Sequence, residues 1–213
     1  MSLAPRDDEA EAFLRAGAPV VLVDAFHPSL PCLRTDDVAG GMLATRHLIE
    51  LGHERIAFVG DRPDPALGFV SSDRRRDGYR RALQEAGIPV RRELLREGPH
   101  GRLVAHRLTR ELLSLPEPPT AIFAFNDNIA IGAIQAARAR GLRVPEDLSI
   151  VGFDDVEGAT IVSPALTTVR QPLEEMGRTA VSLLNRLLER QRFETLHLEL
   201  ATRLVVREST APV

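Results

Sequence analysis

Four short apolar runs alternate with amphipathic segments along the chain. The runs are continuous and rich in β-branched and aromatic residues, which is typical of strands buried on both faces. They lie at residues 20–23, 56–59, 121–125 and 150–153. Apolar positions at helical spacing predict helices at 38–51, 72–86, 102–115, 127–140 and 172–190. This alternation predicts an α/β fold with a mostly parallel sheet.

Each apolar run is followed by a carboxylate or carboxamide side chain. These are Asp24, Asp61, Asn126 with Asp127, and Asp154 with Asp155. In an open parallel sheet, ligands bind outside the carboxyl ends of the strands. Acceptors and donors of this kind, with arginine from the run 74–76, suit a ligand that carries vicinal hydroxyl groups.

Local roles compete with ligand binding at several of these positions. Asp127 and Asp155 stand where helices begin and are interpreted as helix caps, and Asp61 is interpreted as a turn residue before the loop Arg62-Pro63-Asp64-Pro65. Of the three adjacent arginines, at least two are expected to be solvated. Asp24, Asn126 and Asp154 therefore remain open between a structural and a ligand-binding role.

The amino-acid composition excludes several classes of catalytic and metal-binding chemistry. The chain has 213 residues and a net charge of −3, and all 27 of its basic residues are arginine. Without lysine there is no amine for a Schiff base or a P-loop. The single cysteine, Cys32, forbids an internal disulfide and a cysteine zinc cluster and is expected to be a small buried hydrophobe. No hydrolase elbow, dinucleotide fingerprint or zinc helix motif occurs, so we expect no enzyme activity, cofactor or metal site.

Charge and hydropathy also set the expected compartment. The mildly acidic charge is spread along the chain and shows no nucleic-acid footprint. No apolar run approaches the roughly 20 residues of a membrane span. The first fifteen residues are charged and lack an apolar signal region. These features predict a cytoplasmic protein with no membrane partner.

Six motifs, in this order, resemble the effector-binding core of the LacI/GalR family of bacterial transcription regulators. They are Leu51-Gly52-His53-Glu54-Arg55-Ile56, Arg75-Arg76-Asp77-Gly78-Tyr79, Thr120 to Asp127, Gly141 to Asp155, Leu166-Thr167-Thr168-Val169 and Arg207-Glu208-Ser209. The resemblance covers about residues 18–209. It implies two Rossmann-like parallel-sheet subdomains of the periplasmic-binding-protein type.

The resemblance also implies a domain organisation. The amino-terminal subdomain would comprise residues 1–36 and 165–190, and the carboxy-terminal subdomain residues 37–164 and 191–213. No counterpart of the family's DNA-binding head, or of the first βα units of the core, is recognised before Ala18. The family implies a homodimer, with the helices near 38–51 and 72–86 as candidates for the pairing surface. Operator DNA would be bound only through a head absent from this chain.

Family positions that match this sequence imply an effector site. Its expected residues are Asp24, Arg75, Asn126, Asp154, His100 and Ser71. His100 stands where many members place an aromatic that stacks on the ligand, so a weaker stacking platform is expected here.

The sequence therefore predicts the effector-sensing and dimerisation core of a LacI-family regulator. It would bind a small polyhydroxylated ligand, sugar-like or nucleoside-like, in the cleft between the subdomains and so modulate operator binding. The alternative is a soluble sugar-binding protein of a transport system, which shares this fold but would carry a secretory signal.

Overall fold

The computed structural model describes residues 4–62, 70–191 and 197–213, which fall into two units. The larger unit comprises residues 37–62, 71–171 and 202–213. The remaining described residues form the smaller unit. Of the loop expected after Asp61, residues 63–65 lie outside the described part of the chain.

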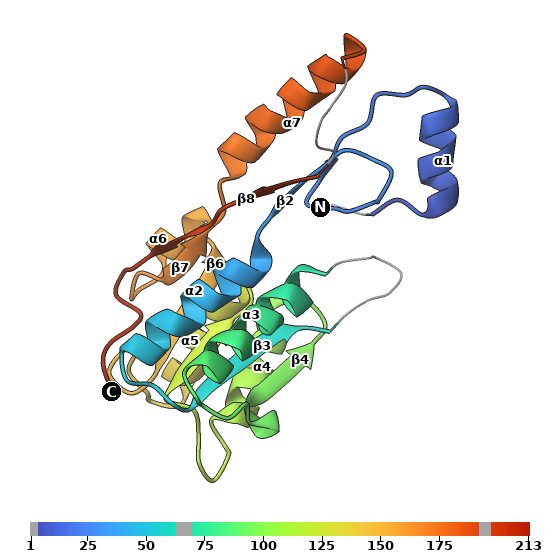
Figure 1. The fold of residues 1–213 in the computed structure, drawn as a ribbon. Helices are drawn as coiled ribbons and strands as arrows, with labels where there is room; N and C mark the ends of the chain where they lie inside the picture. Colours follow the sequence, from blue (N-terminus) through green and yellow to red (C-terminus); the bar gives the residue numbers. More distant parts are fainter. Residues whose placement is uncertain (1–3, 63–69, 192–196) are drawn as a thin grey trace. The chain divides into compact units, whose positions relative to one another are not determined.

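The larger unit is built on a six-stranded sheet in the order β4-β3-β5-β6-β7-β9 (Figure 1). The strands are β3 (Ile56–Asp61), β4 (Leu95–Gly98), β5 (Ala121–Ala124), β6 (Ser149–Asp154), β7 (Thr167–Arg170) and β9 (Arg203–Val205). Neighbouring strands are parallel except β7 and β9, which pair antiparallel. The carboxyl ends of β3, β5 and β6 therefore meet at one edge, which we call the carboxyl edge.

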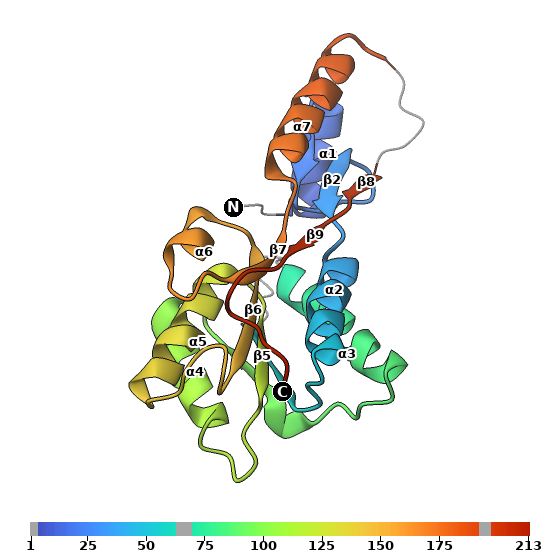
Figure 2. The ribbon, with the colours of Figure 1, turned by 90° about the vertical axis from the view of Figure 1, so that its left-hand side faces the viewer.

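Helices cover both faces of this sheet (Figure 2). On one face lie α2 (Asp37–Glu50) and α3 (Ser71–Glu85), and on the other α4 (Arg102–Leu112), α5 (Asp127–Ala139) and α6 (Glu157–Ile161). A 3₁₀ turn (Arg92–Leu94) precedes β4. The apolar runs of the central strands are fully buried between these layers, with Phe58 and Phe123 in edge-to-face contact.

Two glycines allow α2 and α3 to pack unusually close. A Cβ on Gly78 would lie 2.2 Å from the carbonyl oxygen of Val38, and one on Gly41 would lie 2.3 Å from that of Arg75. Both distances are far below van der Waals contact, so only hydrogen fits at these positions. The close approach brings the start of α2 against the first turns of α3, where the site residues lie.

The smaller unit has a three-stranded parallel sheet in the order β1-β2-β8. Its strands are β1 (Leu22–Val23), β2 (Cys32–Thr35) and β8 (His197–Leu200), and its helices are α1 (Asp7–Arg15) and α7 (Leu173–Leu188). Cys32 is fully buried in this small core, as expected, and burial raises the pKa of its thiol.

The α/β fold class and the parallel sheets expected from the sequence are confirmed. Among the described residues, the grouping of segments differs from the expectation at three places. Val70 belongs to the smaller unit. Within the segment 165–190, β7 belongs to the larger unit because it pairs with β6. Within 191–213, β8 belongs to the smaller unit because it pairs with β2. Among the described helices, none is both long and apolar enough to cross a membrane.

Candidate functional site

Polar side chains of the larger unit gather at its carboxyl edge, and Arg75 is their centre. Arg75 lies on α3, where the tight packing on α2 leaves it only 3% exposed. Its Nε donates to Asp37 Oδ1 at 2.7 Å, and its Nη1 donates to the carbonyl of Phe125 at 2.7 Å. The same Nη1 lies 3.3 Å from Asp154 Oδ1. One buried guanidinium therefore connects α2, the end of β5 and the end of β6.

Aromatic rings surround this guanidinium. Its carbon lies 3.6 Å from the ring centroid of Phe153 and 5.9 Å from that of Phe125. A cation over a ring face is attracted by the ring quadrupole, more strongly where water is excluded. The rings and the two carboxylates hold Arg75 in one orientation.

Asp154 ends β6 in an unusual backbone conformation, with φ 112°. Its Oδ1 accepts from Gln171 Nε2 at 2.6 Å as well as from Arg75. Burial raises the pKa of Asp154, and the charge of Arg75 and the bond from Gln171 act in the opposite direction. A strained residue held by its neighbours at a strand end is common where proteins bind ligands.

Asp155 forms ion pairs within the larger unit that stabilise the fold. It has φ 60° and accepts hydrogen bonds from Arg170 and, at 2.5 Å, from Arg207 Nη2. It is therefore not the helix cap that the sequence suggested, because both of its oxygens are engaged by arginines from β7 and from the segment after β9.

At the start of α5, Asn126 rather than Asp127 is the helix cap. Asn126 is the N-cap, with its Oδ1 accepting from Ile129 N at 2.9 Å. Asp127, expected to be the cap, is instead fully buried and accepts from Thr168 Oγ1 at 2.5 Å and from Val156 N at 2.9 Å. Burial raises its pKa to about 7. Among the residues that the structure describes, no hydrogen bond engages the amide NH₂ of Asn126, which can donate to further partners.

His100 lies in the loop between β4 and α4 at the same edge. Its Nδ1 is 2.8 Å from Asp61 Oδ2, and its ring stands edge-on to that of Phe125. Asp61 is thus the last residue of β3 and the partner of His100, rather than only a turn residue. Ser71 is the half-buried first residue of α3, and the neighbouring Ser72 accepts from the backbone N–H of Asp61 through its Oγ.

Asp24 belongs to the smaller unit. It is exposed, follows β1 with φ 55°, and donates its backbone N–H to the carbonyl of Leu33 at 2.8 Å. Its expected ligand contact stays a prediction.

The structure thus brings Arg75, Asn126, Asp154 and His100 to one edge of one sheet. Sequence reasoning missed Asp37, Phe125 and Gln171 at this edge, and it gave Asp61 a different role. Asp37 could have been suspected, because an acid at the start of a helix that precedes an arginine-rich helix is a natural ion-pair partner. Nothing local indicated Gln171.

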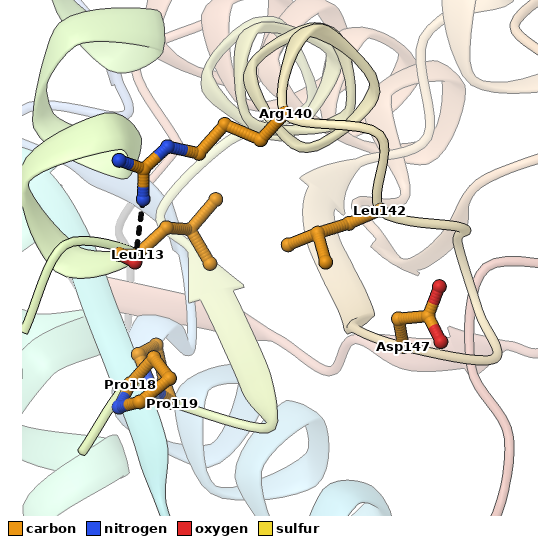
Figure 3. Close-up of a pocket in the computed structure, with 6 residues that line it drawn as sticks. All are labelled: Leu113, Pro118, Pro119, Arg140, Leu142 and Asp147. Carbon is orange, nitrogen blue, oxygen red and sulfur yellow. Dashed lines mark hydrogen bonds between the residues drawn. The ribbon is translucent and has the colours of Figure 1, made fainter. Parts of the chain in front are cut away.

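A pocket of about 510 Å³ lies on the larger unit near the opposite, amino ends of β5 and β6 (Figure 3). Its lining residues are Leu113, Pro118, Pro119, Arg140, Leu142 and Asp147. Arg140 donates to the carbonyl of Leu113 at 2.5 Å, and Asp147 is paired with Arg143, so both charged groups are already engaged. Among the described residues, no group of three or more histidine, cysteine or acidic side chains could hold a metal ion.

Comparison with known proteins identifies the class. A family described as a periplasmic binding protein-like domain matches residues 45–210. The chain is 40% identical to the HTH-type transcriptional regulator DegA of Bacillus subtilis over 92% of this chain and 57% of that protein. The chain therefore belongs to the LacI family of transcription regulators and spans little more than half the length of this relative.

Solved structures of transcription regulators are also similar to this chain. The complex of the transcriptional regulator CelR with cellobiose superposes with a TM-score of 0.85 and 35% identity, covering 97% of this chain and 63% of that one. A LacI-family regulator from Enterococcus faecium with bound ribose gives a TM-score of 0.86 and 31% identity, covering 98% of this chain and 76% of that one. The chain corresponds to an effector-binding core of this family.

Proposed function

We propose that this chain is the sensing core of a cytoplasmic, non-enzymatic regulator that binds a small polyhydroxylated effector. The carrying observation is the convergence of Arg75, Asn126, Asp154 and His100 on the carboxyl edge of the larger unit. Cellobiose and ribose in related regulators support this class of ligand. Ser71, the first residue of α3, completes the proposed site on the larger unit.

Effector binding would alter operator affinity through a DNA-binding head outside this chain. A ligand shifts such an equilibrium only by the difference in its affinity for the two states, which for allosteric proteins is about 1–3 kcal/mol. That the related proteins are named regulators and repressors favours this role over the sugar-binding component of a transporter.

A thermal-shift screen with pentoses, hexoses, cellobiose, nucleosides and purine bases tests the proposal. An effector present at 100 times its dissociation constant stabilises the native state by about 2.7 kcal/mol. Failure of the whole panel to stabilise the chain would contradict the proposed function.

Substitution at Asn126 separates ligand contact from helix capping. Asn126→Asp keeps an oxygen that can cap Ile129 N but removes the amide donor. We expect calorimetry to show at least tenfold weaker effector binding. Asn128→Asp, the same change at an exposed position of α5, is the control and should leave affinity unchanged. Equal affinity of both variants would remove Asn126 from the site.

We also propose a homodimer, formed through the face of the larger unit that carries α4, α5 and α6. Leu103 on α4 is 87% exposed and Ile161 on α6 is 72% exposed, and both helices pack against α5 (Figure 2). Large exposed apolar side chains on one face favour a protein interface. The outer side of α3, by contrast, carries charged residues such as Arg80 and Arg81, which makes the pairing surface inferred by resemblance less suitable.

Sedimentation analysis distinguishes the two surfaces. Leu103→Arg with Ile161→Arg should convert the dimer to a monomer, whereas Arg80→Glu with Arg81→Glu should leave it intact. Dissociation by the second pair alone would place the interface on α3.

A further inference from the structure

The chain after β9 makes a network of polar contacts in the larger unit, away from the carboxyl edge. We call residues 207–213 the return segment (Figure 2). Its Ser209 Oγ donates to the carbonyl of Ile150 at 2.6 Å and accepts from Thr167 N at 2.8 Å. The return segment is therefore joined to the beginnings of both β6 and β7.

A buried imidazole from the loop between α2 and β3 contacts this segment. His53 is 4% exposed, with its Nε2 3.1 Å from the carbonyl oxygen of Ala211 and its Nδ1 2.9 Å from Thr120 Oγ1. A carbonyl oxygen only accepts, so Nε2 carries the proton. In the neutral ring, Nδ1 then accepts from the hydroxyl of Thr120. Both nitrogens of the neutral ring are thus satisfied without water.

A second imidazole contacts the same segment from the last turn of α2. His47 is half-buried, and its Nε2 lies 3.0 Å from Thr210 Oγ1. The hydroxyl of Thr210 in turn lies 3.2 Å from that of Thr167, whose oxygen accepts from Arg207 N at 2.9 Å. Two successive residues of the return segment, Thr210 and Ala211, are therefore each held by a histidine.

Neither ring has a charged partner that favours its protonated form by an ion pair. The histidine ion pairs of the described residues involve His27 and His100. Burial lowers the pKa of both His47 and His53; Glu50 opposes this at His47, and the neighbouring His53 adds to it. The other charged residues next to these contacts along the chain are Arg46, Glu54, Arg55, Glu117, Asp147, Arg207 and Glu208. Most of these are paired with other residues.

We propose that His47 and His53 form a pH-sensitive clasp, which holds the return segment while both rings are neutral and releases it when they take up protons. A proton on Nδ1 of His53 removes the acceptor for the Thr120 hydroxyl and places a charge where water is excluded. A charge on His47 repels it further. In the released form the rings are hydrated and protonate near pH 6.5. The clasp therefore stabilises the closed form above about pH 6.5 and is lost as pH falls below this value.

Hydrogen exchange in the unmodified chain measures the release. Each histidine that is neutral in the closed form and hydrated in the open form raises the opening constant about tenfold between pH 7.5 and pH 5.5. The amide of Ala211 donates to Ser149 Oγ, and that of Val213 donates to the carbonyl of Leu51. After correction for the intrinsic exchange rate, the protection of both amides should fall at least tenfold. Constant protection over this range would overturn the proposal.

The amide of Phe125 separates release of the segment from unfolding of the whole unit. It donates to the carbonyl of Val59, between two buried strands. We expect Ala211 and Val213 to be less protected than Phe125 at both pH values, because their opening is local. Equal protection of all three amides would mean that the segment leaves only when the unit unfolds, which contradicts a clasp.

Glutamine at the two histidine positions removes the titration but keeps a donor and an acceptor on each side chain. In His47→Gln with His53→Gln, the protection of Ala211 should change less than twofold between pH 7.5 and pH 5.5. His106→Gln on α4, across the sheet from α2, is the matched control and should keep the full change.

The single variant His53→Gln serves if circular dichroism shows that the double variant is unfolded. It should lose about tenfold of the pH-dependent change, because one of the two titrating rings is gone. A folded variant of either kind that keeps the full pH dependence would show that these histidines do not control the segment.

Discussion

The two units differ in how completely their sheets are covered, and this difference decides where charge can be buried. In the larger unit, helices on both faces leave Arg75 and Asp37 almost inaccessible, and their ion pair is 2.7 Å long. In the smaller unit, the pair Arg34 with Glu199 is partly exposed. Buried pairs hold one geometry, whereas exposed ones are screened by water and salt.

The helices show the same contrast. In the smaller unit, α7 buries Met176 and Leu183 but leaves Leu173, Val181 and Leu188 exposed. In the larger unit, the polar groups of the carboxyl edge are held by bonds to one another. Polar groups that are held in place lower the entropic cost of binding a ligand.

The largest expected effect comes from breaking the buried ion pair. Arg75→Met leaves the carboxylates of Asp37 and Asp154 without their cation, so the free energy of unfolding should fall by about 3–5 kcal/mol. Arg34→Met in the smaller unit should cost less than about 1 kcal/mol, because its partner is partly exposed. Denaturant titration followed by circular dichroism measures both. Similar losses would refute the contrast between the units.

A smaller effect is expected from adding one methyl group to a helical glycine in each unit. Gly78→Ala places a Cβ against the carbonyl of Val38 and should destabilise the chain by about 1–3 kcal/mol. At Gly177 on α7 a Cβ would meet no described atom within 4 Å. Gly177→Ala should stabilise the chain by roughly 0.5–1 kcal/mol, since alanine favours a helix. Thermal unfolding should therefore shift in opposite directions, and a shared sign would contradict the packing argument.

Much of the fold could be predicted because the central strands of the larger unit are continuous apolar runs. By contrast, β4 contains Arg96 and Glu97 and is only partly buried, so its pattern does not stand out. In β7, the buried residues Thr167 and Thr168 are polar and form hydrogen bonds, so this strand has no continuous apolar run. Elements stabilised by distant polar partners leave a weak local signal.

The candidate site shows the same limit. Arg75 and Asp154 were placed at one edge because strand ends converge in a parallel sheet, and the contact between them agrees with this. Asp127 was misinterpreted as a cap because its partner Thr168 lies 41 residues away, and spacing within α5 contains no information about it. Residues whose roles depend on contacts between elements required the structure.

The smallest expected effect concerns a buried and an exposed carboxylate, one in each unit. The pKa of Asp127 is raised to about 7 by burial, so folding takes up a proton at this group. Its contribution to stability is therefore complete below the unfolded pKa of about 3.9 and is lost as pH rises through 7. Asp8 on α1 is exposed, and its pKa is lowered by the hydrogen bond from Arg6, so its contribution is lost only as pH falls.

Asparagine at position 127 resembles the protonated acid, with one acceptor for Val156 N and one donor toward Thr168. From pH 5 to pH 7, we expect the unmodified chain to lose about 1–2 kcal/mol relative to Asp127→Asn. Asp8→Asn should show no such change over this range. Urea titrations at half-unit pH intervals measure both differences. A flat difference for Asp127→Asn would mean that the carboxylate stays ionised in the folded chain, and that the covering of this sheet does not govern its charge.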